Sequence, residues 1–479
     1  MKKTALLLLA ALLLSACNSG GKNSSDLEVS SVMSEETSQV LSETSEASPA
    51  GNSSQAAVSE TASAASSQKT STPNMNYASD SSAVSSKAPV NHPVPPSMAD
   101  LKKALTVKPT ITYVPSLNYS DSVKAAFYTG MSQNGKSVRV FCYIGFPVGA
   151  SAASKVPAVV LVHGGGGQAF PQWVEEWTKR GYAAIAMDNY GNMPGTGTGG
   201  AFVKDTMGGP MYDEYNSIDQ PIDTQWMYHA VCDAILANNV LRADDRVDVR
   251  KIGITGISWG GIITGLTIGA DSRFAFAVPV YGCGFLSGCK TYFSDIYKKP
   301  KVAEYWGVEN FAPFADMPVL WLNSDGDGNF PLDSFSKTAA VTPGSALTIK
   351  PSLAHGHIEG WEPDEIYAFA DKHCKKGSKG LAVIKSQPQK SMGRNVTFDV
   401  DPAGNAIHTV RVFYTTAPLS YSAGRPNTLT SVFKFVDGTY SNGKASVTLP
   451  ADAHSYYVNV ITNDNGKAII ASTQFVVLK

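Results

Sequence analysis

Hydrophobic residues recur along the middle of the chain in short, nearly unbroken runs, with stretches of helical spacing between them. Such runs are typical of parallel strands that are buried on both faces of a sheet. The runs occupy residues 157–162, 182–187, 251–255, 276–280, 318–322 and 346–349. Helices are expected between them at residues 173–179, 224–241, 258–268 and 363–373. This alternation predicts a doubly wound, mostly parallel α/β sheet, led by an antiparallel pair at residues 123–129 and 137–146.

The pattern changes after residue 380, where no helical period is visible. Short apolar stretches follow one another, separated by turns that contain Asp-Gly, Asn-Gly or proline. The expected strands are 397–400, 409–415, 431–436, 445–449, 456–461 and 468–477. We therefore predict an α/β region over residues 97–380 and an immunoglobulin- or fibronectin-like β-sandwich over residues 381–479.

The N-terminus has the pattern of an export signal. Lys2 and Lys3 precede an apolar run from Ala5 to Leu14, which is well short of the roughly 20 residues that a bilayer-spanning helix needs. The run ends in Leu-Ser-Ala-Cys, which resembles the lipobox of bacterial lipoproteins and implies a signal peptide over residues 1–17 with lipid attachment at Cys17. An ordinary cleaved signal peptide with an incidental cysteine is the alternative.

Residues 18–96 are dominated by Ser, Ala, Thr and Glu and contain a single aromatic residue, Tyr77. Such a segment buries too little apolar surface to offset the entropy of ordering, so we expect a disordered tether. Together with the lipobox, it predicts an extracytoplasmic protein anchored by lipid to a bacterial membrane. The periplasm and the outer face of a single-membrane cell remain equally compatible with this pattern.

Charge and cysteine content indicate which partners, disulfides and metal sites the chain can be expected to have. The 39 basic and 40 acidic residues nearly cancel, so nothing favours nucleic acid as a partner. Five cysteines follow Cys17, and this odd number prevents complete pairing within one mature chain. Cys283 and Cys289 are close enough for a local bridge in an oxidising compartment; unpaired buried thiols are expected for the other cysteines and are the alternative for this pair. No Cys/His spacing suggests zinc, and we expect neither a metal nor a cofactor.

The first signal of chemistry is the G-x-S-x-G pattern at residues 256–260, which lies directly between a predicted strand and a predicted helix. A tight strand-to-helix turn needs glycine where a Cβ would strike the neighbouring backbone. A turn of this kind exposes the Ser258 hydroxyl at the carboxyl edge of the sheet, above a helix N-terminus. We therefore predict that Ser258 is a nucleophile rather than a serine in a purely structural turn.

The second signal is His163 followed by four glycines, immediately after another predicted strand. A glycine run lets backbone N–H groups approach a ligand closely. We assign the two oxyanion-binding N–H groups to Gly165 and to Trp259, the residue after the nucleophile. His163 is expected to hold the loop. A phosphate-binding loop is excluded because neither a Gly-Lys-Ser/Thr ending nor a spaced G-x-G-x-x-G is present.

The third signal supplies an acid and a base after the next strands. Asp325 and Asp327 follow the strand at 318–322, and His355 and His357 follow the strand at 346–349. The order serine, acid, histidine is that of the α/β-hydrolase fold. The spacing of Asp325, Asp327 and Asn329 also suggests the start of a calcium loop, but Phe330 and Ser336 occupy the positions where that loop needs glycine and glutamate.

These motifs resemble the acetyl xylan esterase and dienelactone hydrolase-like branch of the α/β-hydrolases. The resemblance rests on VLVHGGGG at 160–167, TGISWGG at 255–261, VPVYGCGF at 278–285 and His-Gly-His at 355–357, and it extends to the C-terminal sandwich. It implies a carboxylic-ester hydrolase that acts on a small-molecule or carbohydrate ester. It favours Asp327 over Asp325, because Asp327 lies four residues before Pro331, and it favours His355 over His357. Ser324 replaces a usual glycine and leaves the choice of acid open.

Substrate selection is less constrained by the sequence. The stretch 191–219 follows a strand end and is expected to form part of the pocket wall. Aromatic residues that could stack on sugar rings, or simply pack in the core, are Tyr190, Tyr212, Tyr215, Trp226 and Tyr281. Two other functions stay open: a serine peptidase of the prolyl oligopeptidase type, although no propeller repeat precedes the α/β region, and a non-catalytic binding protein on a hydrolase scaffold.

Overall fold

The computed structural model describes residues 92–195, 201–464 and 466–479. The predicted signal peptide, the lipid-attachment residue Cys17 and most of the predicted tether lie outside these residues. The last part of the predicted tether is included, and there Pro95 is buried. Ser97 is also buried, and its hydroxyl donates to the Tyr305 carbonyl at 2.6 Å. Within the described ranges, no helix combines the length and apolarity needed to cross a membrane.

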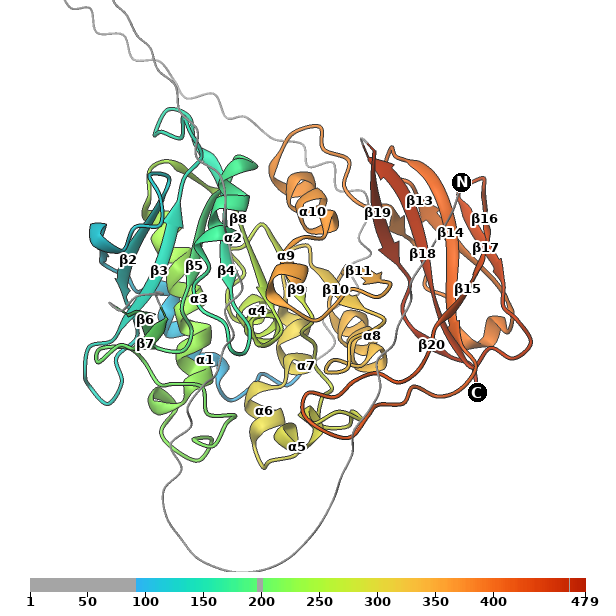
Figure 1. Cartoon of the computed structure of the whole chain (residues 1–479), viewed down its shortest axis with the longest axis horizontal. Helices are drawn as coiled ribbons and strands as arrows, with labels where there is room; N and C mark the ends of the chain where they lie inside the picture. Colours follow the sequence, from blue (N-terminus) through green and yellow to red (C-terminus); the bar gives the residue numbers. More distant parts are fainter. Residues whose placement is uncertain (1–91, 196–200, 465) are drawn as a thin grey trace, which may run out of the picture. The chain divides into compact units, whose positions relative to one another are not determined.

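A nine-stranded sheet forms the centre of the α/β region (Figure 1). Its order is β1-β2-β3-β5-β4-β8-β9-β10-β11; the strands from β5 to β11 pair in parallel, and the edge from β1 to β5 is antiparallel. The strands are β1 Ile111–Tyr113, β2 Val123–Thr129, β3 Arg139–Gly145, β4 Val156–Val162, β5 Ala183–Met187, β8 Val247–Ile257, β9 Phe276–Val280, β10 Leu320–Ser324 and β11 Ala346–Lys350. This topology is that of an α/β hydrolase and confirms the predicted fold class.

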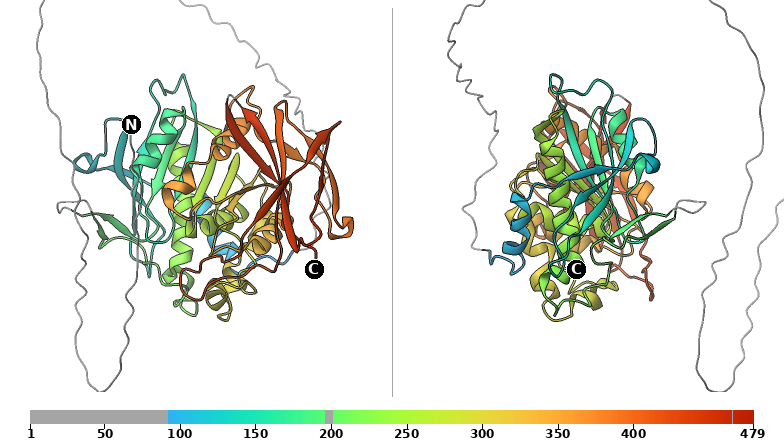
Figure 2. Two further views of the ribbon diagram at one scale, coloured as in Figure 1. Left: turned by 45° about the vertical axis from the view of Figure 1, so that its right-hand side comes forward. Right: turned by 90° about the vertical axis from the view of Figure 1, so that its left-hand side faces the viewer.

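Helices cover both faces of this sheet. Helices α3 (Trp226–Ala243) and α4 (Trp259–Ala270) pack on each other and on β8, and Figure 2 shows the long helix α3 lying along the sheet. Helices α2 (Pro171–Lys179) and α10 (Asp364–Cys374) meet through the rings of Trp177 and Tyr367. All residues of α4 are buried, which explains why its sequence is apolar on every side. The other described α-helices are α1 Met98–Lys102, α5 Phe293–Tyr297, α6 Val302–Trp306, α7 Val308–Phe311, α8 Leu332–Val341 and α9 His357–Trp361.

Strand β10 begins at Leu320, two residues after the predicted start. Pro318 has no N–H to donate, so it cannot extend the ladder as a central-strand residue does. Its carbonyl nevertheless accepts from the Ala277 N–H at 3.0 Å, which aligns β10 with β9. Within the stretch expected to form a pocket wall, a small hairpin of β6 (Asn192–Pro194) and β7 (Phe202–Lys204) is present.

The C-terminal all-β region consists of two antiparallel sheets, as predicted. One has the order β12-β13-β17-β16, and the other has the order β15-β14-β18-β19 with β20 paired to β18. The strands are β12 Val383–Ile384, β13 Asn395–Asp401, β14 Ala406–Thr415, β15 Lys434–Asp437, β16 Thr439–Ser441, β17 Lys444–Thr448, β18 Ser455–Asp464, β19 Lys467–Ser472 and β20 Val476–Val477. Burial alternates along β13, as expected for a sheet with one solvated face.

The other sheet is covered on both faces at its central strand, β18. Consecutive residues of β18 are buried, because β19 packs on β11 and α10 of the α/β region. Thr348 donates to the Ile470 carbonyl at 2.7 Å, and the Ile349 N–H donates to the Ser472 hydroxyl at 2.7 Å. The single strand predicted at 468–477 is instead divided into β19 and β20. Between them the Phe475 N–H donates to the Ser336 hydroxyl at 2.8 Å rather than to a strand partner.

Candidate active site

The Ser258 turn joins β8 directly to α4. Ser258 has φ 60° and ψ −117°, a conformation that costs a non-glycine residue free energy and that is found mainly where function requires it. Its N–H donates to the Val280 carbonyl at 2.9 Å, which ties the turn to β9. A Cβ at Gly260 would collide with the carbonyl oxygen of Val162, and a Cβ at Gly256 would collide with that of Gly260. Both glycines of the motif are therefore required by backbone packing.

His355 lies between Ser258 and Asp327. Its Nε2 is 3.0 Å from the Ser258 hydroxyl oxygen, and its Nδ1 is 2.9 Å from Asp327 Oδ2. The ring packs against Tyr281, with centroids 4.7 Å apart, and about 25% of the side chain is exposed. An imidazole held in this way can remove the serine proton and later return it to a leaving group.

The Asp327 carboxylate is oriented by the backbone of its own loop. Its side chain is fully buried, and Oδ1 accepts the N–H groups of Asn329 at 2.7 Å and Phe330 at 3.0 Å. Oδ2 is left to face His355. The carboxylate therefore has three hydrogen-bonding partners. Among the described residues, no cluster of three or more His, Cys, Asp or Glu side chains could hold a metal ion.

Asp325, the alternative acid, points elsewhere. Its Oδ1 accepts the Ser352 N–H at 2.7 Å, and its Oδ2 accepts the Tyr457 hydroxyl at 2.8 Å. Burial raises the pKa of Asp325, and the two hydrogen bonds oppose that shift. Since Tyr457 belongs to β18, this carboxylate joins the loop after β10 to the C-terminal sandwich. Sequence reasoning could not have found this partner, which is 132 residues away.

His357, the alternative base, contacts the glycine loop instead of the serine. Its Nε2 accepts the Gly164 N–H at 3.1 Å, and its ring packs on Phe170 with centroids 4.9 Å apart. Burial lowers the pKa of His357, which keeps the ring neutral and able to accept that hydrogen bond. The two histidines of the His-Gly-His motif therefore have different partners: His355 contacts Ser258 and Asp327, whereas His357 contacts the glycine loop.

His163 secures the glycine loop from the other side, as predicted from the sequence. Its Nδ1 is 2.9 Å from the Gly164 carbonyl, and its Nε2 accepts the Asn189 N–H at 3.1 Å. Burial lowers the pKa of His163 to about 3, so the ring is neutral with its proton on Nδ1. Asn189 also donates to the His163 carbonyl at 2.9 Å. The sequence analysis missed Asn189, whose position two residues beyond the end of β5 is the one signal that could have marked it.

The glycine loop and the start of α4 are adjacent. A Cβ at Gly165 would lie 3.0 Å from Cδ1 of the Trp259 indole. In the described part of the chain, no protein group accepts the Gly165 N–H. Trp259 is the first residue of α4, and N–H groups in a first helical turn have no partner within their helix. The glycine loop thus lies against the first residue of α4, and each of the two segments carries a backbone N–H without a protein acceptor among the described residues.

Aromatic side chains pack around Trp259, but several of the sequence candidates belong to the core. Tyr215 is nearly fully buried, and Trp226 and Tyr281 are fully buried, so none of these three offers a face to a sugar ring. Tyr190 and Tyr212 stack on each other with centroids 5.5 Å apart. Tyr212 also meets the Trp259 ring edge-on at 5.2 Å. The segment that follows β7 thus reaches the residue next to the nucleophile.

The cysteines take no part in this arrangement. All five cysteines of the described ranges are buried and unpaired, so Cys283 and Cys289 form no bridge. Burial raises the pKa of the Cys283 thiol well above its ordinary value, which makes it a poor nucleophile.

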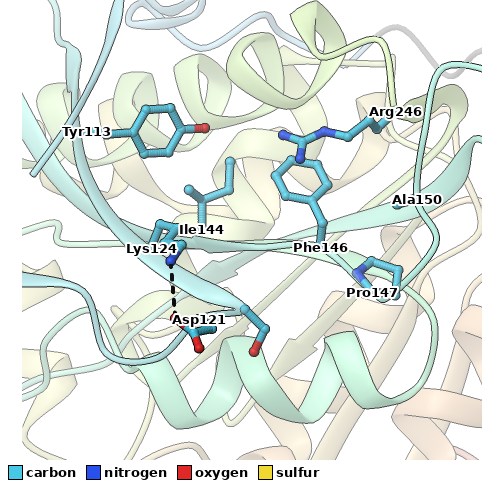
Figure 3. A pocket seen from close by; sticks show the side chains of 9 residues that line it. Tyr113, Asp121, Lys124, Ile144, Phe146, Pro147, Ala150 and Arg246 are labelled. Carbon is cyan, nitrogen blue, oxygen red and sulfur yellow. Dashed lines mark ion pairs between the residues drawn. The ribbon is translucent and has the colours of Figure 1, made fainter. Parts of the chain in front are cut away.

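A separate hollow of about 370 Å³ lies beside the antiparallel edge of the sheet (Figure 3). Tyr113, Lys124 and Arg246 line it, and the Arg246 guanidinium lies 3.5 Å from the centroid of the Phe146 ring. Ser122 also lines it, but no histidine or cysteine does. The Ser122 hydroxyl lies 3.2 Å from the Ser120 hydroxyl and no histidine lines the hollow, so it lacks the acid–histidine–serine line that leads to Ser258.

A comparison with known protein families finds a match over the part of the chain that carries these residues. A model of the prolyl oligopeptidase family matches residues 170–356, a stretch that includes Ser258, Asp327 and His355 but covers less than half of the chain. No curated protein matches the sequence.

Several solved structures are similar to this chain. An acetyl xylan esterase from Paenibacillus sp. R4 is 16% identical with a TM-score of 0.46, over 58% of this chain and 92% of that one. Acetyl xylan esterase 1 from Thermoanaerobacterium sp. is 18% identical with a TM-score of 0.46, over 59% and 95%. An acylaminoacyl peptidase from Pyrococcus horikoshii is 17% identical with a TM-score of 0.41, over 55% and 44%.

Proposed function

We propose that this protein is a serine hydrolase that cleaves carboxylic esters through an acyl-enzyme on Ser258. The observation that carries the proposal is the continuous hydrogen-bonded line from Asp327 through His355 to the Ser258 hydroxyl, on a strained strand-to-helix turn. A nucleophile, a base and a group that orients the base are the parts that covalent acyl transfer requires.

In the first half of the reaction, His355 Nε2 takes the proton as the Ser258 oxygen attacks the ester carbonyl carbon. The carbonyl oxygen becomes an oxyanion, and the N–H groups of Gly165 and Trp259 stabilise it. The intermediate collapses, the C–O bond to the alcohol breaks, and His355 returns the proton to the departing oxygen. Water then attacks the acyl-enzyme by the same steps, which releases the carboxylic acid and restores Ser258. Asp327 holds the imidazole with its proton on Nδ1 throughout.

Acylated carbohydrate is the substrate class that we favour. Support comes from the resemblance of the motifs at 160–167, 255–261 and 278–285 to acetyl xylan esterases and dienelactone hydrolases. The export signal and Cys17 extend the proposal to an enzyme anchored by lipid outside the cytoplasm, where polysaccharide is accessible.

A serine peptidase is the second candidate, and the family match over residues 170–356 is the observation that favours it. The same three residues would cleave an amide, so substrate choice is what separates the two functions. Turnover of p-nitrophenyl acetate and acetylated xylo-oligosaccharides would therefore be compared with turnover of acylaminoacyl p-nitroanilides.

The test uses the purified protein beside Ser258→Ala, with Ser122→Ala as a matched control, because Ser122 is an exposed serine with no histidine partner. We expect ester turnover and fluorophosphonate labelling in the wild type and in Ser122→Ala, and neither in Ser258→Ala. Hydrolysis of the anilides alone would favour the peptidase. A folded wild-type protein that neither turns over nor becomes labelled would favour a binding protein.

A further inference from the structure

The C-terminal sandwich sends a long segment onto the α/β region. Between β14 and β15, residues 416–433, here called the strap, leave the sandwich and run toward α5 and α6, as the orange segment at the bottom of Figure 1 shows. The Tyr292 N–H donates to the Asn427 side-chain carbonyl at 2.7 Å. The strap therefore contacts a surface of the α/β region that the packed strands of the sandwich do not reach.

The strap also touches the loop that carries Asp327. A Cβ at Gly328 would collide with the carbonyl oxygen of Asn427, so the strap lies directly on the residue after the acid. Only glycine allows the two backbones to approach this closely.

Arg425 attaches the strap to the segment that follows β7. Its guanidinium makes a two-pronged ion pair with Glu214, in which Nη1 donates to Oε2 at 2.9 Å, and it lies 4.5 Å from the centroid of the Tyr292 ring. Glu214 also accepts the Tyr212 hydroxyl at 3.1 Å. Arg425 is thus held by a carboxylate and an aromatic face at once, although 47% of its side chain is exposed.

Side-chain contacts connect the Arg425–Glu214 pair to the nucleophile turn. Glu214 holds Tyr212, and Tyr212 packs on Trp259, the residue that follows Ser258. A second set of contacts runs through Tyr292, which stacks on Phe293, whose ring in turn meets Trp259 at 5.2 Å. The strap and the segment after β7 therefore converge on the surroundings of Ser258, and the Arg425–Glu214 pair joins them.

We propose that the strap is a wall of the approach to Ser258 and that the Arg425–Glu214 pair, by joining it to the segment after β7, limits the size of the ester that is accepted. This inference rests on the proposed esterase function and extends it to selectivity. The C-terminal sandwich is then part of the substrate-selecting structure rather than a separate module.

The chain offers a closely matched control. Arg411 and Asp437 form the same kind of two-pronged pair, with bonds of 2.6 and 3.0 Å, and Arg411 lies 4.3 Å from the centroid of the Phe435 ring. That pair joins β14 to β15, the two strands that flank the strap, on the sandwich itself. It therefore reproduces the chemistry of the Arg425 pair without the contact to the α/β region.

The experiment compares kcat/KM for p-nitrophenyl octanoate and for a fully acetylated xylo-oligosaccharide with kcat/KM for p-nitrophenyl acetate. The variants are Arg425→Gln, Glu214→Gln, the charge swap Glu214→Arg with Arg425→Glu, and Arg411→Gln, each checked for folding by thermal unfolding. We expect the bulky-to-small ratio to rise about fivefold or more for at least one bulky ester in both single variants, to return toward the wild-type value in the swap, and to stay unchanged in Arg411→Gln.

A ratio that does not change in folded Arg425→Gln and Glu214→Gln, or one that falls, would overturn the inference. An equal rise in Arg411→Gln would also overturn it, because the effect would then come from loosening the sandwich. A wild-type protein without ester turnover would instead refute the proposed function, so the two failures are distinguishable.

Discussion

Replacing Asp327 with asparagine should abolish most activity while leaving the fold intact, and the structure gives the reason. Oδ1 of Asp327 accepts two backbone N–H groups, and Oδ2 faces His355 Nδ1. The asparagine oxygen must take the Oδ1 position, because an NH₂ group there would point at two donors. The NH₂ group then donates to His355 Nδ1, which forces the ring proton onto Nε2. With a proton on Nε2, His355 cannot accept the proton of Ser258.

The expected loss follows from that wrong tautomer. Substitution of this kind in a serine triad lowers kcat about 10⁴-fold, which corresponds to roughly 5.5 kcal/mol of transition-state stabilisation. The matched control is Asp325→Asn, in the same loop and equally isosteric, whose partners are Ser352 and Tyr457 rather than His355. We expect its kcat to stay within about tenfold of wild type, because no group of the triad changes its proton.

The assay is steady-state hydrolysis of p-nitrophenyl acetate from pH 6 to 9, with thermal unfolding of each variant. A folded Asp327→Asn protein that retains a tenth or more of wild-type kcat would contradict the tautomer argument. If Asp325→Asn lost as much activity as Asp327→Asn, the division of roles between the two carboxylates would be wrong.

Three further outcomes follow from the structure. Gly260→Ala should destabilise the fold by about 1–3 kcal/mol and weaken fluorophosphonate labelling, because the added Cβ meets the Val162 carbonyl; urea unfolding and labelling measure both. Tyr457→Phe leaves Asp325 Oδ2 without its donor and should cost about 1–3 kcal/mol in urea unfolding, with little change in kcat for p-nitrophenyl acetate. Burial raises the pKa of Asp188 from 3.8 to about 7, so the folded state keeps a proton that the unfolded chain releases, and stability falls as the pH rises between these values. In Asp188→Asn, the decrease in the free energy of unfolding between pH 5 and pH 8, measured with urea, should be smaller by on the order of 2–4 kcal/mol. An unchanged pH dependence would show that the pKa of Asp188 is not raised in this way.

Much of the fold could be predicted because the buried strands carry their signal locally. Strand β9 was predicted with its observed bounds, 276–280, since an apolar run flanked by polar residues has one stable placement in a two-sided sheet. The Ser258 turn was equally visible, because close backbone approach demands glycine at fixed positions. The division of the last predicted strand could not be foreseen, because at Phe475, between β19 and β20, the hydroxyl of Ser336 from a distant element replaces a ladder partner.

The choice between the two acids and between the two histidines could not be made from the local sequence, because it depends on partners that are distant along the chain. Asp325 and Asp327 are chemically identical, and their roles separate only because Tyr457 lies on one side of the loop and His355 on the other. His355 and His357 likewise separate only through the Gly164 N–H. The resemblance to known hydrolases favoured the two residues that lie beside each other in the structure, whereas residue type and spacing alone left both pairs open.

The loop after β10 is where the sandwich and the triad meet. Asp325 binds Tyr457 of β18, Asp327 orients His355, and Gly328 lies against Asn427 of the strap, all within four consecutive residues. Alternating carboxylates on a tight loop point to opposite sides, so one loop can be fixed by the sandwich and still present an acid to the histidine. Loss of the sandwich contacts would free the backbone that supplies the two N–H donors to Asp327 Oδ1. The loop is therefore held by two separate contacts from the C-terminal region, so that losing the Tyr457 contact alone leaves the strap contact at Gly328 in place.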